Sequence, residues 1–230
     1  TVTEGHGRAI VLRGALGNGK THLAEWLARR AHEVGAAMVL RIELVGDSGT
    51  QCTLAPIVHQ LMHTEGLDRV GTRKRLADGM ALFRQFHPTE IDALVDLLGP
   101  YGDEGDHGDQ DVDTAKAWYV LVRRMLQQHT ATRPVMILMD DVHTSVEAIA
   151  FARHLVRAQA YEPHAILLVM SCDDVNLVGN IEAQLDEFCA LPDVDSLTIG
   201  ALPPEHRSLL VREILGLDRT LAELVERRSG

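Results

Sequence analysis

The sequence is poor in cysteine and has no long hydrophobic run. Its three cysteines, Cys52, Cys172 and Cys189, lie far apart and lack metal-ligand spacing. This argues against a disulfide scaffold and is typical of a reducing compartment, so we expect a cytoplasmic protein. No apolar stretch approaches the roughly 20 residues that cross a bilayer, and no signal-peptide pattern opens the chain. We therefore expect no membrane segment.

Basic residues are also few, with 22 against 33 acidic ones and a formal net charge of −11. Without a broad basic face to neutralise a phosphate backbone, this segment is not expected to bind nucleic acid directly. Hydrophobic residues make up 46% of the 230 positions, enough for one sizeable core, and this excludes a disordered chain. The chain begins at Thr1 without a methionine and ends at Gly230 after a helix-like segment, so we expect a fragment of a larger protein.

Short apolar runs alternate with helical patterns along the chain. This alternation is typical of a parallel sheet covered by helices, so the expected class is α/β with a five-stranded, mostly parallel sheet. The candidate buried strands are rich in Val, Ile, Leu and Met: Ala9–Arg13, Met38–Val45, Val135–Met139, Ile166–Met170 and Ser196–Ile199.

The stretch between the second and third of these strands is far longer than one crossover requires. Apolar residues recur at helical spacing from Leu54 to Met62 and from Trp118 to Met125. His87-Pro88-Thr89-Glu90 has the pattern of another helix start. We therefore expect a helical insertion over about residues 50–130.

A glycine-rich segment follows the first predicted strand. It reads Gly14-Ala15-Leu16-Gly17-Asn18-Gly19-Lys20-Thr21 and matches G-x-x-x-x-G-K-[ST], the phosphate-binding P-loop (Walker A) pattern. A chance match in a chain of this composition has a probability on the order of 2 in 1000, before the preceding strand and following helix are required. The glycines let backbone N–H groups point at phosphate oxygens, aided by the positive end of the helix dipole.

The loop sequence predicts a division of labour on bound ATP. Lys20 is expected to reach the β- and γ-phosphates, and Thr21 to supply its hydroxyl to Mg²⁺. His22, the next residue of the helix, is included among the expected nucleotide-binding residues.

A second acidic pattern closes the third strand. The apolar run Val135–Met139 ends in Asp140 and Asp141, a Walker B pattern. Asp140, at the strand tip beside the phosphate loop, is expected to hold Mg²⁺ through water. Asp141 is expected to orient or deprotonate the attacking water, so Asp141 and Lys20 are the expected catalytic residues. The alternative is that Asp141 only caps a helix that starts near Ser145.

Together, "GALGNGKTHL", "VMILMDDVH" and the closing "LTIGALPPEHRSLLVREILGLDRTLAELVERRSG" resemble the STAND class of signal-transduction ATPases. The module type is similar to the Orc/Cdc6 branch of AAA+ proteins and is found in bacterial transcription regulators and fused to protein kinases. The resemblance implies an ATPase core over residues 1–200, the start of a helical lid over 201–230, and ATP or ADP with Mg²⁺ as cofactors. It also implies two kinds of partner. These are the effector or repeat domains of the parent protein and, in a homo-oligomer, further copies of the chain.

The chain departs from this class at one position. The fourth strand of such modules often ends in an arginine that senses the γ-phosphate, whereas here it leads into Ser171-Cys172-Asp173-Asp174. We therefore expect slow hydrolysis. Ser171 is either a weak sensor or only a polar residue that ends the strand.

Several other polar residues are weaker candidates for a site. His143 matches a position near the nucleotide in this class, but a structural histidine would look the same. His59 and His63 have the i, i+4 spacing of shared metal ligands, yet no third ligand is evident, so surface histidines are favoured. The acidic segment 99–111 lacks the spacing and closing glutamate of an EF-hand, which favours a solvated loop over a calcium site.

Tryptophans and arginines give weaker signals. Trp26 and Trp118 fall in helical patterns and are expected in core or lid contacts. The candidates for an arginine finger toward a neighbour's phosphate are Arg153, Arg157, Arg207 and Arg212.

Three functions remain open on the sequence. The first is an ATP-binding, slowly hydrolysing regulatory switch in a larger signalling or transcription-regulator protein. The second is a small-molecule kinase, which would need an acceptor pocket beside the phosphate loop. The third is an interaction module that keeps nucleotide as a structural ligand without hydrolysing it. The distance of about 120 residues between the two motifs favours the switch over a compact kinase.

Overall fold

The computed structural model describes residues 6–44, 50–81, 86–99, 112–175, 177, 180–203 and 206. Its elements, in chain order, are β1 (Arg8–Gly14), α1 (Lys20–Glu33), β2 (Met38–Glu43), α2 (Thr50–Met62), α3 (Arg69–Ala81), α4 (Pro88–Leu97), α5 (Val112–Thr130), β3 (Val135–Asp140), the 3-10 turn η2 (Val142–Thr144), α6 (Val146–Ala158), β4 (Ile166–Asp173), α7 (Asn180–Cys189) and β5 (Val194–Thr198).

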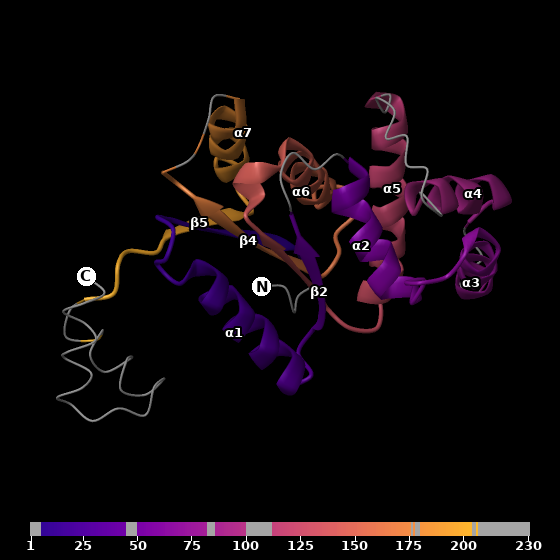
Figure 1. The fold of residues 1–230 in the computed structure, drawn as a ribbon, viewed down its shortest axis with the longest axis horizontal. Helices are drawn as coiled ribbons and strands as arrows, with labels where there is room; N and C mark the ends of the chain where they lie inside the picture. The colour runs from indigo at the N-terminus through magenta and orange to yellow at the C-terminus, as the bar shows by residue number, and fades with distance from the viewer. Residues whose placement is uncertain are drawn as a thin grey trace.

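The five strands form one sheet in the order β2-β3-β4-β1-β5, and every neighbouring pair is parallel (Figure 1). The expected α/β class and five-stranded sheet are therefore confirmed, with all pairs parallel rather than most. Because all strands run the same way, their carboxyl ends meet at one edge. The segments after β1 and β3 therefore lie at the same edge of the sheet.

The strand boundaries differ from the sequence prediction most at β5, which spans Val194–Thr198 rather than Ser196–Ile199, and at β4. The prediction ended β4 at Met170, whereas the strand continues to Asp173. The extension is polar, but Ser171, Cys172 and Asp173 pair with Leu12, Arg13 and Gly14 of β1. Pairing with a neighbouring strand, which periodicity does not reveal, holds these residues in extended conformation. The predicted end of the second strand at Val45 lies outside the described residues.

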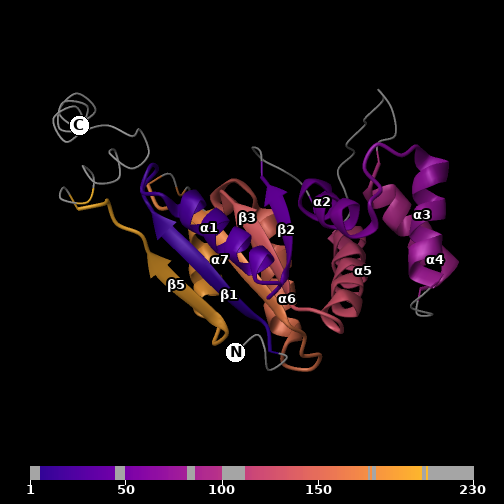
Figure 2. The same ribbon diagram turned by 90° about the horizontal axis from the view of Figure 1, so that it is seen from below.

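Helices cover the two faces of the sheet unequally (Figures 1 and 2). Of the described helices, α1 alone lies on one face, where Ala24 and Ala28 pack in a cluster with Leu12, Leu138 and Val169. These small alanine side chains let the helix approach the strands closely. The larger core lies on the other face, beneath α2, α5, α6 and α7.

Four of the described helices, α2 to α5, lie between β2 and β3, where the sequence predicted a helical insertion. α3 and α4 project away from the sheet (Figure 2). Trp118 of α5 is buried and donates its indole N–H to the carbonyl of Ala93 at 3.0 Å, which joins α5 to α4. Trp26 of α1, by contrast, is 52% exposed. Of the two tryptophans, only Trp118 belongs to the core.

A buried polar cluster joins α5, α6 and the segment before β4. Arg123 forms an ion pair with Glu162, while its Nε and the Nε2 atoms of His154 and His164 are buried without a hydrogen-bond partner among the described residues. Burial lowers the pKa of both histidines, and the charge of Arg123 lowers them further. Both rings therefore become protonated at a lower pH in the folded protein than in the unfolded chain.

These two histidines predict acid-sensitive stability. Since their folded pKa lies below the unfolded value of about 6.5, the unfolded chain binds more protons as the pH falls past that value. Each histidine then lowers the free energy of unfolding by at most about 1.4 kcal/mol per pH unit. We expect urea unfolding of the wild type to show this loss from pH 7 to 5.5, and His154→Gln/His164→Gln to flatten it. The exposed His32→Gln is the control, and a double variant with the wild-type slope would contradict the assignment.

Candidate nucleotide site

The glycine-rich segment Gly14–Thr21 forms the connection between β1 and α1. Gly14 has φ 151°, and a Cβ there would lie 2.3 Å from the carbonyl oxygen of Ile199, so only glycine fits this close approach. Gly19, with φ 87°, is the residue directly before α1. Its left-handed backbone turns the chain into the helix, so the N-terminus of α1 opens at the loop, as an anion site requires.

Lys20 lies inside this loop. Its ammonium donates to the carbonyl oxygens of Gly14 at 2.8 Å and Ala15 at 2.9 Å, and the side chain is only 5% exposed. The loop thus folds around the lysine charge. Of its neighbours, Leu16 is 80% exposed at the turn, and His22 is exposed on the first turn of α1.

Ile199, directly after β5, forms hydrogen bonds with the loop and with the end of β1. Asn18 donates its amide N–H to the carbonyl of Ile199 at 2.8 Å, and the Ile199 N–H donates to the Arg13 carbonyl at 2.7 Å. The loop is therefore attached to the sheet at both ends, and its backbone is restrained before any ligand binds.

Asp140 lies at the end of β3, beside the start of α1. Its Oδ1 accepts a hydrogen bond from the Thr21 hydroxyl at 3.1 Å and another from the Ser171 hydroxyl. The structure thus brings together a hydroxyl and a carboxylate that are 119 residues apart in the chain. These are oxygen ligands of the kind that Mg²⁺ binds, so the pair fits this metal.

Asp141 has an unusual backbone for a residue other than glycine, with φ 54° and ψ 44°. Its N–H donates to Ser171 Oγ at 3.0 Å, and its side chain is 50% exposed. The carboxylate makes no capping hydrogen bond. Ser145 instead caps α6, accepting from the Ala148 N–H at 3.2 Å. The capping alternative is thus not the role seen in the structure, and the carboxylate stays accessible at the loop edge.

His143 lies behind this acidic pair. Its Nδ1 accepts from the Asp173 N–H at 3.3 Å and lies 3.9 Å from Asp141 Oδ1. At 3.9 Å, the contact between His143 Nδ1 and Asp141 Oδ1 is too long for a hydrogen bond. The structure thus places His143 as a link between η2 and the end of β4.

The sequence analysis missed Arg13. Its guanidinium pairs with Asp174 at 2.8 Å and Asp186 at 3.0 Å, which ties the residue before the phosphate loop to the segment after β4 and to α7. These two carboxylates raise the pKa of Arg13. Asp174 occupies the region where the resemblance implies a sensor arginine, and it binds an arginine from β1. The sequence feature that could have indicated this ion pair is the carboxylate of Asp174, which lies in the segment where the resemblance implies an arginine.

The candidate finger arginines are dispersed. Arg153 donates to the Gln184 carbonyl at 3.0 Å and pairs with Glu187 at 3.4 Å, so it joins α6 to α7. Arg157 is exposed on α6. Arg207 and Arg212 lie outside the described residues, as do residues 100–111 of the acidic segment and most of the expected lid. Cys172 is buried, which raises the pKa of its thiol to about 12, so it is an inert core residue.

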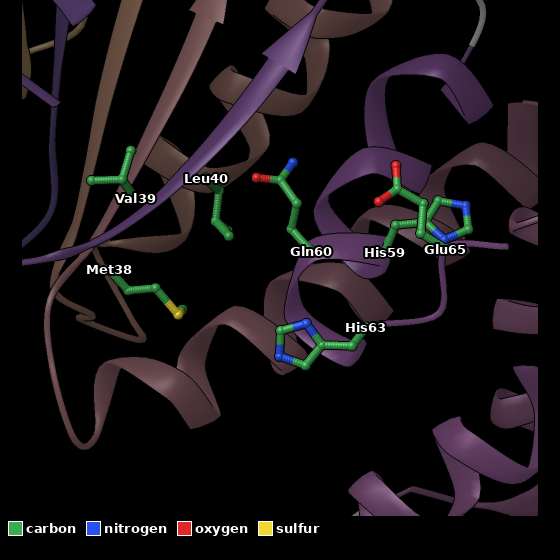
Figure 3. A pocket seen from close by; sticks show the side chains of 7 residues that line it. All are labelled: Met38, Val39, Leu40, His59, Gln60, His63 and Glu65. Carbon is green, nitrogen blue, oxygen red and sulfur yellow. The ribbon is translucent and has the colours of Figure 1, made fainter. Parts of the chain in front are cut away.

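A groove of about 440 Å³ lies between β2 and the end of α2 (Figure 3). Its lining comprises Met38, Val39, Leu40, His59, Gln60, His63 and Glu65. Met38 to Leu40 form the amino end of β2, whereas the phosphate loop lies at the carboxyl edge. Gln60 covers part of this outer strand, donating to the Arg41 carbonyl and accepting from its N–H at 2.9 Å.

Within the described residues, the two histidines of this groove belong to no group of three metal-ligating side chains. His59 Nδ1 lies 2.9 Å from Thr64 Oγ1, and burial lowers the pKa of this ring. His63 follows the end of α2 with φ 52° and is exposed. No group of three or more His, Cys, Asp or Glu side chains able to hold a metal occurs in the part of the chain that the structure describes. Within the same residues, no helix is long and apolar enough to span a membrane.

No protein-family model and no curated protein sequence matches the chain. Solved structures do match. The HORMA:CdnC:Trip13 complex of E. coli MS115-1 includes a chain with TM-score 0.50 and 14% identity, a match that covers 97% of this chain and 59% of that one. Drosophila ORC bound to AT-rich DNA and Cdc6 gives TM-score 0.42 and 14% identity, with 89% and 53% covered. The plasmid coupling protein TrwB in complex with ADP and Mg²⁺ gives 0.33 and 12%, with 84% and 67% covered.

The first of these likenesses, together with the sheet order and the phosphate loop, defines the fold as that of a P-loop NTPase. The chain spans little more than half the length of the first two chains it matches.

Proposed function

We propose that this chain binds ATP with Mg²⁺ and hydrolyses it slowly, as the regulatory switch domain of a larger signalling or transcription-regulator protein. The observation that carries the proposal is the hydrogen bond between Thr21 and Asp140, which joins the phosphate loop to the acidic pair. A phosphate cradle and a magnesium carboxylate are the two parts that every ATPase of this fold requires.

In this proposal the N–H groups of the loop and the Lys20 ammonium bind the phosphates. Mg²⁺ would be held by the Thr21 hydroxyl and by Asp140, and it would neutralise charge on the phosphate oxygens. Asp141 orients or deprotonates the attacking water. The preference for adenine, the STAND or AAA+ membership, the cytoplasmic location and the effector, repeat-domain or self-association partners follow from the sequence resemblance.

Slow turnover is supported by what surrounds the loop. Among the described arginines, Arg13 and Arg153 are held in ion pairs with carboxylates, and the segment Ser171–Asp174, where the resemblance implies a sensor arginine, contains no arginine. Without an arginine at the end of β4, the transition state would lose the electrostatic contribution that a sensor arginine makes at the γ-phosphate. A switch benefits from this, because each ATP-bound state then persists long enough to be read by other domains.

Two alternatives differ in what they need. A small-molecule kinase needs an acceptor pocket beside the loop, whereas the groove along Met38 to Leu40 lies at the opposite end of β2. A non-hydrolysing interaction module needs only the phosphate cradle, and the lack of an arginine in the segment Ser171–Asp174 is compatible with it.

Single-turnover incubation with γ-labelled ATP and Mg²⁺, followed by separation of phosphate from phosphorylated small molecules, distinguishes these functions. The switch predicts slow, complete release of inorganic phosphate with water as acceptor. Label transferred to an added metabolite pool would support the kinase. Tight binding with no release over many hours would support the interaction module and would overturn the hydrolytic part of the proposal.

A further inference from the structure

Ser171 sits at the centre of the acidic site, although the sequence left it as either a weak sensor or a strand end. It lies in the polar extension of β4, paired with Leu12 of β1, and it is completely buried. A fully buried hydroxyl must find hydrogen-bond partners inside the protein. The partners that Ser171 finds are both from the acidic pair.

Two hydrogen bonds pass through this one hydroxyl. Ser171 Oγ–H donates to Asp140 Oδ1, and the same oxygen accepts from the Asp141 N–H at 3.0 Å. The donor and an acceptor site of the hydroxyl are therefore both engaged. The chain of bonds is continuous from the backbone of Asp141 through Ser171 to the carboxylate of Asp140, and from there to Thr21.

The arrangement fixes the Asp140 carboxylate. Both described hydrogen bonds to this group, from Ser171 and Thr21, reach Oδ1, and within the described residues none reaches Oδ2. Two donors on one oxygen hold the plane of the carboxylate and leave the second oxygen for the water shell of a metal. A carboxylate held in this way loses less conformational freedom when the metal binds.

The same hydroxyl fixes the backbone of Asp141. A left-handed conformation is unfavourable for a residue other than glycine and persists only where surrounding contacts hold it. The N–H of Asp141 is held by Ser171, and its carbonyl accepts from the Thr144 N–H at 2.9 Å and the Thr144 hydroxyl at 2.8 Å. The turn that presents the Asp141 side chain is therefore anchored on both sides of its α-carbon.

We propose that Ser171 is a positioning residue that aligns Asp140 for the metal and holds Asp141 in its left-handed turn, and that it does not sense the γ-phosphate. This inference rests on the proposed function. It deepens that function by giving the polar end of β4 a role toward the metal, in the place where a sensor arginine is expected.

The two roles for Ser171 make different predictions for ATP and ADP. A γ-phosphate sensor contributes to ATP binding alone. A residue that acts through Asp140 contributes equally to Mg²⁺·ATP and Mg²⁺·ADP, and it contributes nothing when the metal is chelated. The measured quantity is therefore the ratio of affinities with Mg²⁺ and with EDTA, for each nucleotide.

We expect Ser171→Ala to reduce this ratio about tenfold for ATP and for ADP alike, while the affinity in EDTA changes by less than about twofold. A tenfold loss of affinity corresponds to about 1.4 kcal/mol, which is close to the contribution of one hydrogen bond to a charged group. Asp140→Ala defines the complete loss of the metal contribution. Calorimetric titrations of both nucleotides against the wild type and these variants give all the required values.

A matched pair controls for packing at this buried position. Ser171→Thr keeps the hydroxyl and Ser171→Val has nearly the same shape without it, so any strain from the added methyl groups is common to both. Threonine should retain most of the magnesium ratio and valine should lose it. Thermal unfolding of each variant verifies that the titrated protein is folded. If Ser171→Ala is too unstable to titrate, the comparison of Ser171→Thr with Ser171→Val still tests the inference.

Three results would overturn the inference while leaving the proposed function intact. They are an unchanged magnesium ratio in Ser171→Ala and Ser171→Val, a loss restricted to ATP, and an equal loss with and without Mg²⁺. Failure of the wild type to bind ATP at all would instead refute the proposed function, and the inference with it.

Discussion

Lys20→Ala should weaken Mg²⁺·ATP binding by at least about 100-fold while the protein stays folded. The side chain lies inside the loop that would receive the phosphates, and among the described residues its ammonium donates to the carbonyls of Gly14 and Ala15 alone. A lost charge-assisted contact costs about 1.5–3 kcal/mol, and Lys20 is expected to contact two phosphates. Calorimetric titration of ATP measures this loss. An affinity within about threefold of the wild type would refute the assignment of the loop.

The structure adds a stability cost that the sequence did not suggest. Lys20 was expected to serve the phosphates alone, yet the side chain is buried and two loop carbonyls depend on it. Removing it should cost about 1 kcal/mol, or about 2–4 °C in Tm for a chain of this size. Lys20→Met keeps the aliphatic stem and should bind as poorly as the alanine variant. Lys74→Ala, at an exposed position on α3, should leave both affinity and Tm unchanged.

The order and type of the elements could be predicted because most of the strands contain a run of apolar residues, as in Val135–Met139 of β3 and Ile166–Met170 of β4. Parallel strands then bring their carboxyl ends to one edge, so the proximity of Asp140 to the loop followed from topology once the strands were placed. The hydrogen bond from the Thr21 hydroxyl to Asp140 agrees with this expected proximity. The roles of these residues toward ATP remain predictions.

Register and backbone conformation could not be predicted in the same way. Ser171 faces Asp140 because β4 continues three residues beyond its apolar run, and that extension depends on pairing with β1. The left-handed turn of Asp141 has no sequence signal, since neither glycine nor asparagine marks it. The ion pairs of Arg13 join three segments that are distant in sequence, and no local pattern reports such contacts.

Asp141 offers the sharpest test of hydrolysis, because its backbone already favours one substitution. Asparagine is among the residues that best tolerate a left-handed conformation, so Asp141→Asn should keep φ near 54° and change little except the charge. The carboxylate makes no capping bond that the variant could lose. A fall in activity would therefore report the carboxylate itself rather than a rearranged turn.

We expect Asp141→Asn to bind Mg²⁺·ATP within about threefold of the wild type and to release phosphate at least about 100-fold more slowly, the lower range for loss of a general base. Aspartate is one methylene shorter than glutamate, which many ATPases use in this role. If it acts through a second water, wild-type turnover should be under about 1 s⁻¹, below the usual range. Phosphate release at matched nucleotide occupancy measures both rates. Glu43→Gln, at the neighbouring strand end, is the control carboxylate. Equal rates for wild type and Asp141→Asn would show that Asp141 takes no part in hydrolysis, and the interaction-module function would then be favoured.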